Sequence, residues 1–302
     1  MYRLASALAA MALVLAACGG EDPAADTASE PESQEPPPAL VIGGIPDQEV
    51  ALLEERFDGV ATYLSDEVGI PVRYQPSVDY AAVVTSFANG EVKLGWFGGL
   101  TGVQARLETE GAEAVLQRPI DAEFRSVFIA NADFEADTIA DLASSRFTFG
   151  SESSTSGHLM PRYFLQQDGV DPEADFDGQP GYSGSHDKTY KLVEAGSFEV
   201  GALNSSVWDQ AVEDGAVDTD IVREVARTPT YFDYHWVVHP DVDEVYGDGT
   251  SDKLVEALMG MQDAGPAATD TLELFETDSF IPTENANYAQ IEEVARSLDL
   301  IQ

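Results

Sequence analysis

The chain is short of cysteine and of positively charged side chains. Among its 302 residues there is one cysteine, Cys18, so no disulfide can form within a single molecule and the hydrophobic core must hold the fold. Lys and Arg together number 15 against 55 Asp and Glu, which gives a formal net charge of −40. Nucleic acids and anionic membrane surfaces both attract Lys and Arg, so this charge argues against either as a partner.

Lysine is particularly scarce. A surface rich in carboxylates keeps a protein soluble where salt shortens the range of their mutual repulsion. We therefore expect a halophilic source, and the alternative is an unusually acidic secreted protein from a low-salt habitat. The four lysines are Lys93, Lys188, Lys191 and Lys253.

Motifs that identify common enzymes are also missing. The chain has no Gly-x-Gly-x-x-Gly or Walker loop, no Gly-x-Ser-x-Gly elbow and no Ser-x-x-Lys at 153–159. No group of His, Cys and carboxylates has the spacing of zinc ligands. We expect no metal, no cofactor and no enzymatic activity. The alternative from another class is a surface serine hydrolase that uses Ser154 or Ser156 with a histidine.

The N-terminus has the features of an export signal. Arg3 precedes an apolar stretch over 4–15, which is too short to span a bilayer because that requires about 20 residues. The sequence Leu15-Ala16-Ala17-Cys18 resembles a bacterial lipobox. That resemblance implies cleavage of a signal peptide over 1–17 and lipidation of Cys18. A plain secretory signal with an incidental cysteine is the alternative.

The rest of the chain divides into a linker and a folded body. Residues 18–38 are rich in Glu, Asp, Ser, Ala and Pro, so we predict a disordered tether there. The body alternates strand and helix patterns, which favours an α/β fold with mainly parallel sheets. Strands are predicted over 40–43, 72–75, 94–97, 126–130, 147–150, 200–203 and 234–238, and helices over 50–67, 80–88, 100–107, 139–143, 158–167, 188–195, 251–261 and 288–298.

Two polar clusters lie where helices are predicted to begin. The run Ser153–Gly157 follows a predicted strand, and Gly184–Asp187 precedes the predicted helix at Lys188. The first N–H groups of a helix have no partner within it and attract anions. Each cluster is therefore a candidate anion site, and the alternative for each is an ordinary helix cap. Asn204 and Asp233 are further polar candidates.

Six short motifs together resemble those of the phosphonate-, phosphite- and phosphate-binding proteins of ABC transporters, in the same order and spacing. The resemblance covers roughly residues 40–241. It implies a type II periplasmic-binding-protein fold, in which two α/β lobes joined by a two-stranded hinge clamp a ligand between them. We place lobe 1 at 39–131 with 236–302, and lobe 2 at 132–235. The motifs are Asp79–Val84, Trp96–Gly98, Phe124–Val127, Ser154–Gly157, Gly184–Asp187 and Gly201–Asn204.

The resemblance also implies which residues touch the ligand. Two departures from the family pattern matter: Phe124 replaces a tyrosine, and Ser205-Ser206-Val207 stands where binders of aminophosphonates have an acid. An amine-bearing ligand is therefore disfavoured. The implied ligand-binding residues are Tyr80, Phe97, Arg125, Ser154, Thr155, Ser156, His186, Asp187, Asn204 and Asp233.

We expect a monomeric, extracytoplasmic lipoprotein that binds a small tetrahedral oxyanion and delivers it to a membrane permease driven by an ATPase. Phosphonate, phosphite or phosphate is the expected ligand. Selenate is the alternative, because the motif variants resemble a subgroup described as selenate-binding. If Asp187 or Asp233 accepts a hydrogen bond from the ligand, the site prefers a protonated oxyanion over sulfate or selenate.

Overall fold

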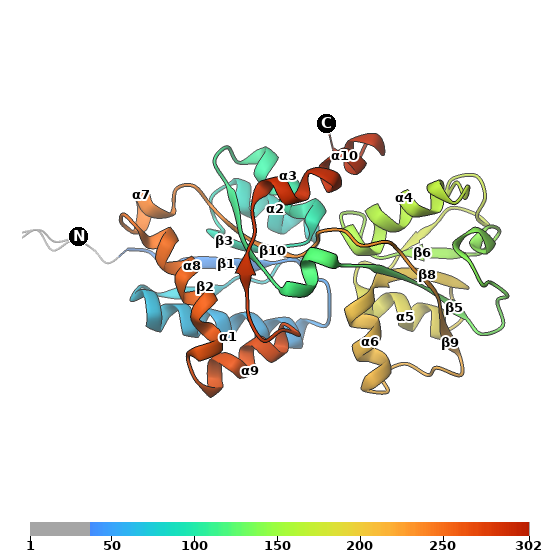
Figure 1. Cartoon of the computed structure of the whole chain (residues 1–302), viewed down its shortest axis with the longest axis horizontal. Coiled ribbons are helices and arrows are strands. Elements are labelled where there is room, and N and C mark those ends of the chain that lie inside the picture. The colour runs from blue at the N-terminus through green and yellow to red at the C-terminus, as the bar shows by residue number, and fades with distance from the viewer. Residues whose placement is uncertain (1–36, 302) are drawn as a thin grey trace, which may run out of the picture. The chain divides into compact units, whose positions relative to one another are not determined.

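The computed structural model describes residues 37–301 (Figure 1). The predicted signal peptide, the lipidation site Cys18 and all but the last two residues of the predicted linker lie outside the described residues. Within 37–301, no helix is both long and apolar enough to cross a bilayer.

The first of two sheets has six strands in the order β11-β4-β10-β3-β1-β2. Helices cover both of its faces, with α1, α8 and α9 on one side and α2, α3 and α10 on the other (Figure 1). The strands are β1 Leu40–Gly44, β2 Val72–Tyr74, β3 Leu94–Phe97, β4 Glu113–Gln117, β10 His235–Val238 and β11 Ile281–Pro282. The helices are α1 Val50–Val68, α2 Tyr80–Ala88, α3 Gly99–Glu108, α7 Val242–Tyr246, α8 Thr250–Gly260, α9 Pro266–Leu274 and α10 Ala289–Ser297.

The second sheet has five strands in the order β7-β6-β8-β5-β9. Helix α4 covers one face, and α5 and α6 cover the other (Figure 1). The strands are β5 Ser126–Asn131, β6 Phe147–Phe149, β7 Gly181–Tyr182, β8 Val200–Asn204 and β9 Val222–Arg227. The helices are α4 Met160–Gln167, α5 His186–Glu194 and α6 Ser205–Glu213.

Strand β5 shows why its residues form a fully covered strand. Successive side chains of a strand point to opposite faces of the sheet. Val127 and Ile129 belong to one hydrophobic cluster, and Phe128 and Ala130 belong to another. The continuous apolar run over 127–130 therefore contributes side chains to two hydrophobic cores.

Both sheets are mixed, so the expectation of mainly parallel sheets is wrong. Strand β1 runs parallel to β2 and β3, but β10 is antiparallel to both β3 and β4. In the other sheet, β5 is antiparallel to β8 and β9. The cause is the path of the chain, which leaves the first sheet after β4 and returns to it only with β10.

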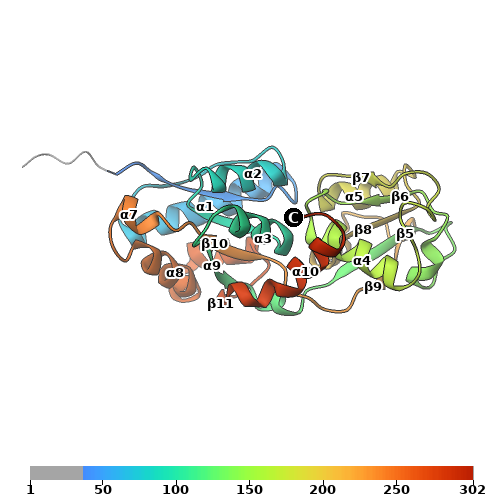
Figure 2. The same cartoon turned by 90° about the horizontal axis from the view of Figure 1, so that it is seen from above.

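Two crossing segments, residues 118–125 and 228–234, connect the sheets (Figure 2). They pair through an antiparallel bridge between Phe124 and Tyr231. The N–H of Phe124 donates to the carbonyl of Tyr231 at 2.9 Å, and the N–H of Tyr231 donates back at 3.0 Å. Strand β5 follows the first crossing and pairs only within the five-stranded sheet, although the expected lobe boundary placed residues up to 131 with the other sheet.

Gly95 offers a test of how tightly the six-stranded sheet is packed. A Cβ at this position would lie 2.1 Å from the ring of Phe97, which is itself buried against Phe87. We expect Gly95→Ala to lower the free energy of unfolding by about 1–3 kcal/mol, because overpacking forces neighbouring side chains to shift. Urea denaturation measures this change. Gly260→Ala is the control, because its nearest neighbour is the Tyr63 hydroxyl at 3.8 Å, and an equal loss of stability in both variants would contradict the prediction.

Candidate ligand-binding site

Polar side chains from both sheets and from the second crossing segment meet at one place. Asp47 follows β1, a turn over 154–156 follows β6, and His186 begins α5. Asn204 ends β8, and the crossing segment contributes Asp233 and Tyr234. These residues are all buried, with at most 5% of their surface exposed. Tyr80, the first residue of α2, is buried beside them.

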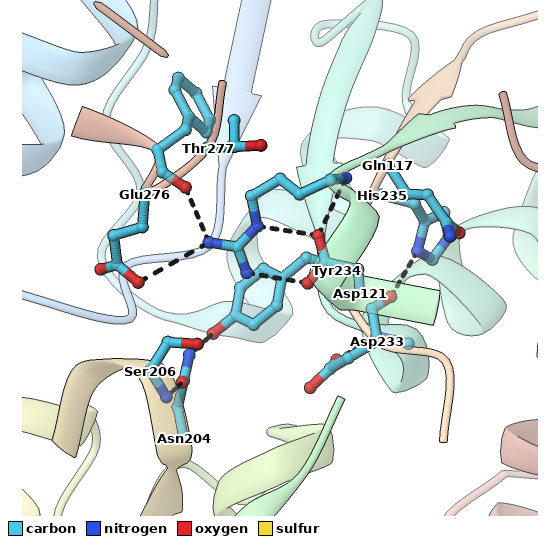
Figure 3. A network of polar contacts seen from close by, with 12 residues as sticks. Gln117, Asp121, Asn204, Ser206, Asp233, Tyr234, His235, Glu276 and Thr277 are labelled. Carbon is cyan, nitrogen blue, oxygen red and sulfur yellow. Dashed lines mark hydrogen bonds and ion pairs between the residues drawn. The ribbon is translucent and has the colours of Figure 1, made fainter. Parts of the chain in front are cut away.

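The hydroxyl of Tyr234 connects three of these segments. It donates a hydrogen bond to Asp47 Oδ2 at 2.8 Å. Its oxygen lies 3.2 Å from Asn204 Nδ2, which donates to it (Figure 3). The same oxygen lies 3.3 Å from His186 Nε2. Burial and the charge of Asp47 raise the pKa of Tyr234 well above 10, so the hydroxyl keeps its hydrogen.

His186 is a neutral donor. The backbone N–H of Asn204 donates to Nδ1 of His186 at 3.3 Å, so Nδ1 is an acceptor and the ring hydrogen resides on Nε2. Burial lowers the pKa of His186 below 6.5, which keeps the ring uncharged. Its own backbone N–H, at the start of α5, donates to the carbonyl of Asp47 at 2.9 Å.

The serine- and threonine-rich turn begins with a π-helix rather than with an α-helix. In the π-helix Thr155–Leu159, backbone hydrogen bonds join residues five positions apart, for example from the N–H of Leu159 to the carbonyl of Ser154 at 3.0 Å. Ser154 caps it, because its hydroxyl accepts from the N–H of Gly157 at 3.0 Å. Helix α4 begins only at Met160, two residues later than predicted. Single π-turns inside helices frequently occur at functional sites.

The start of α3 is capped by side chains from elsewhere in the chain. The N–H of Leu100 donates to Thr155 Oγ1 at 2.9 Å, and the N–H of Gly99 donates to Asp233 Oδ1 at 2.8 Å. Gly98 permits this approach, since a Cβ there would lie 3.1 Å from both oxygens. Thr155 and Asp233 thus accept hydrogen bonds from the backbone N–H groups at the start of α3, a helix that covers the six-stranded sheet.

Buried polar atoms without partners mark the same place. Buried polar groups in proteins are nearly always hydrogen-bonded, so several orphans together indicate a place for a polar ligand or water. Burial and the charge of Asp47 raise the pKa of Tyr80 well above 10, although the neighbouring Ser154 side chain acts in the opposite direction. The buried atoms without partners at this candidate site include Asp47 Oδ1, Tyr80 Oη, Ser206 Oγ and Asp233 Oδ2.

Three of the residues predicted to bind ligand are placed or engaged elsewhere. The ring of Phe97 packs in the core, with its centroid 5.5 Å from that of Phe87. Arg125 is exposed and its Nη1 donates to the carbonyl of Thr228 at 2.6 Å. Asp187 is buried, but it already accepts from Ser185 Oγ at 2.7 Å and lies 3.5 Å from Lys191 Nζ.

Sequence reasoning missed Asp47, Ser206 and Tyr234. Asp47 comes shortly after the strand over 40–43, a position from which side chains often reach a site at the end of a sheet. Tyr234 adjoins the predicted Asp233, and Ser206 lies two residues after Asn204. The position of Asp47 after a strand and that of Tyr234 beside Asp233 can both be read from the sequence. Their hydrogen bond cannot, because it joins residues 187 positions apart.

No serine–histidine pair forms among residues 37–301 that would support a hydrolase. His158 uses Nδ1 toward the carbonyl of Glu152 at 2.6 Å, and its Nε2 accepts from Arg162 Nε at 2.9 Å. Burial lowers the pKa of His158 to about 4, so it is neutral. Neither His158 nor His186 hydrogen-bonds to Ser154 or Ser156 in the described part of the chain, where no group of His, Cys, Asp and Glu could hold a metal ion.

The buried side chain of Arg118 packs against the ring of Tyr234. The Arg118 guanidinium makes two hydrogen bonds of 2.8 Å with Asp121 and donates to the carbonyl of Phe275 at 2.9 Å. It also lies 5.1 Å from the ring centre of Tyr234. Figure 3 shows Asp121 and Glu276 beside this network and Asn204 next to the Tyr234 hydroxyl.

Comparisons with known proteins identify the class. Residues 42–288 match the family of ABC transporter, phosphonate, periplasmic substrate-binding proteins. The chain is 40% identical over 272 residues to a probable ABC transporter phosphite binding protein, PhnD1, of Prochlorococcus marinus (strain MIT 9301), covering 88% of this chain and 92% of that protein. It is 27% identical over 228 residues to the phosphate-import protein PhnD of Mycolicibacterium smegmatis, covering 70% and 68%.

The structural comparison agrees. The structure of Prochlorococcus marinus PhnD1 in complex with methylphosphonate aligns with a TM-score of 0.84, covering 87% of this chain and 99% of that one. The chain belongs to the phosphonate substrate-binding protein family of ABC transporters and has the type II periplasmic-binding-protein fold. Its relatives are transporter components and not enzymes, and the family places it outside the cytoplasm.

Asp233 gives the site a pH dependence. Burial raises the pKa of Asp233 from 3.8 to about 7, and the charge of Asp121 adds to this, while the N–H of Gly99 opposes it. Because the folded-state pKa lies above the unfolded one, the contribution of the protonated carboxyl to stability is complete below about pH 4 and is lost as the pH rises through about 7.

We therefore expect Asp233→Asn to be more stable than the wild type above about pH 7, by roughly 2–4 kcal/mol, and to differ little below about pH 4. Urea denaturation across this range measures the difference between the two proteins. Asp248→Asn, at an exposed position, is the control and should show no such trend. A stability difference independent of pH would contradict the assignment.

Proposed function

We propose that the protein binds a small tetrahedral phosphorus oxyanion, namely a phosphonate, phosphite or phosphate, and delivers it to an ABC permease and its ATPase. The observation that carries this proposal is the group of buried, unpartnered polar atoms beside the capped turn at Ser154. A tetrahedral anion presents several acceptor oxygens at once, so it suits a site with hydroxyl and ring N–H donors from several segments.

We assign one lobe to each sheet with its helices, and the hinge to the two crossing segments. The ligand is then held between the lobes. This assignment puts the first crossing at residues 118–125 and keeps β5 with the sheet in which it pairs. The reciprocal hydrogen bonds between Phe124 and Tyr231 support a hinge of two paired strands.

Neutral donors carry the proposed binding. Ser154, Thr155, Ser156 and Tyr80 supply hydroxyls, and His186 supplies its Nε2 hydrogen, whose contact with the Tyr234 oxygen is long, at 3.3 Å. The net charge of −40 repels an anion at long range, so the attraction must come from short-range hydrogen bonds in a site that excludes water. A saline environment reduces the long-range repulsion further.

The named relatives favour phosphorus over selenium. One is described as phosphite binding, one as a phosphate importer, and the PhnD1 structure holds methylphosphonate. Selenate is the alternative ligand for the same site.

We also propose that Cys18 carries a lipid and that a monomer is tethered to the membrane. Cys18→Ser should then release the protein from the membrane fraction, and retention there would refute the anchor.

Titration calorimetry against a panel of anions tests the ligand class. We expect binding of phosphite, methylphosphonate or phosphate with dissociation constants of about 1 μM or below. Sulfate and selenate should bind more weakly, because they bring no hydrogen to the carboxylates of the site. Tighter binding of selenate than of every phosphorus anion would favour the alternative, and no binding of any anion would refute the proposal.

Removing two hydroxyls from the turn tests the role of Ser154–Ser156. We expect Thr155→Ala with Ser156→Ala to weaken binding at least about 100-fold, since each lost hydrogen bond to a charged ligand is worth about 1.5–3 kcal/mol. Circular dichroism checks that the double variant is folded, and Ser153→Ala, in the same run, should bind normally. Retained affinity in the folded double variant would exclude the turn from the site.

A further inference from the structure

Asp47 is a carboxylate in a place that the proposed function assigns to an anion. Only 2% of its surface is exposed. Its Oδ2 accepts from Tyr234, its backbone carbonyl accepts from His186, and its Oδ1 is buried without a partner. An ionised carboxylate has only acceptor oxygens, so the free oxygen can be satisfied only by a hydrogen-bond donor.

We propose that Asp47 determines which anion the site accepts. Its Oδ1 takes a hydrogen bond from an OH group of the ligand, so the protein selects the partly protonated form of a phosphorus oxyanion and rejects sulfate and selenate, which have no hydrogen at neutral pH. This inference rests on the proposed function and deepens it, because it names the protonation class of the substrate. It assigns to Asp47 a role that the sequence pattern placed on Asp187 or Asp233.

None of the described donors near Asp47 hydrogen-bonds to its Oδ1: the Tyr80 hydroxyl and Arg56 Nε interact with Asp47 electrostatically, but both are themselves without a hydrogen-bond partner. The Tyr234 hydroxyl donates its hydrogen to Asp47 Oδ2, and Asn204 donates to the oxygen of Tyr234. His186 directs its Nε2 hydrogen toward the same oxygen at 3.3 Å. A buried acceptor left without a donor costs about 1–3 kcal/mol, and more if it is charged. A ligand hydroxyl removes this penalty, whereas a fully deprotonated oxyanion adds repulsion.

Charged and titratable groups reach Asp47 from every element around it. Arg56 on α1 is buried, its Nε has no partner, and its attraction to Asp47 opposes the lowering of its pKa by burial. Yet the two side chains form no ion pair within 4.0 Å among the described residues. The other groups that interact with Asp47 are Tyr74 on β2, Tyr80 on α2, His186 on α5, Tyr234 in the crossing segment and Glu276 after α9.

The balance of charge around the site points the same way. Asp47, Asp187 and Asp233 are all buried near it, while Lys191 makes its contacts with Asp187 and with Glu49. In the described part of the chain, no lysine or arginine donates a hydrogen bond to Ser154, Thr155 or Ser156. A site with carboxylates and neutral donors disfavours every additional negative charge, so a ligand that keeps a proton binds with less repulsion.

Asp47→Asn tests the inference, because an amide can donate a hydrogen bond to an unprotonated oxygen. We expect wild type to bind phosphite or methylphosphonate at least about 100-fold more tightly than sulfate. In Asp47→Asn this ratio should fall at least about tenfold, mainly through tighter binding of sulfate. Asp79→Asn is the matched control: it removes one charge next to Tyr80 and keeps a good helix cap, so its ratio should equal that of wild type.

A second measurement does not depend on the folding of Asp47→Asn. Calorimetry of phosphite binding at about pH 8, in two buffers with different ionisation enthalpies, counts the protons taken up. It is made in the wild type and in Asp233→Asn, because the difference between them gives the uptake by the Asp233 carboxyl, and we expect the remaining uptake to be about one proton per phosphite bound.

The outcomes separate the two claims. Uptake near zero, or equal weakening of phosphite and sulfate in Asp47→Asn, would overturn the role of Asp47 in ligand selection and leave it a purely structural residue. Failure of the wild-type protein to bind any phosphorus anion would overturn the proposed function, and this inference with it.

Discussion

The hydrogen bonds at the Tyr234 hydroxyl are the contact on which the rest of the site depends. They join the loop after β1, the start of α5 and the end of β8 to the second crossing segment. Because all the partners are buried, none of these groups can exchange its hydrogen bond for one to water without opening the structure. The cation of Arg118 against the tyrosine ring fixes the position of the hydroxyl from the opposite side.

The candidate site has many hydrogen-bonding groups, but among residues 37–301 no lysine or arginine hydrogen-bonds to Ser154, Thr155 or Ser156. Helix starts are satisfied by side chains from other segments, as where Thr155 and Asp233 cap α3. His186 stays neutral because burial lowers its pKa, and burial also raises the pKa of Asp233 to about 7. Burial thus sets both protonation states, and a protein whose surface is dominated by carboxylates can still offer a local environment of donors.

Strong local patterns made much of the fold predictable, and long-range contacts explain the rest. The predicted boundaries of α2 and β3 agree with the structure, because their apolar spacing is regular. Strand β9 was missed because Arg223, Glu224 and Arg227 interrupt its apolar pattern, and strand direction was mispredicted because it depends on the crossings. Sequence motifs singled out Ser154, His186 and Asn204, which the structure brings to one candidate site, whereas Phe97 belongs to one of the same motifs but its ring packs in the core. Asp47 and Tyr234 depend on a contact between residues 187 positions apart.

The second crossing segment has a consequence for how such a protein can change. Tyr231 pairs the two connecting strands, and within three residues Asp233 and Tyr234 reach the candidate site. In the proposed function, backbone bending and ligand contact therefore share the same few peptide units. A substitution there that changes ligand preference would also alter the stiffness of the connection, so affinity and the rate of ligand release would evolve together. Engineering one without the other is better attempted at Asp47 or in the Ser154–Ser156 turn, which lie outside both connecting strands.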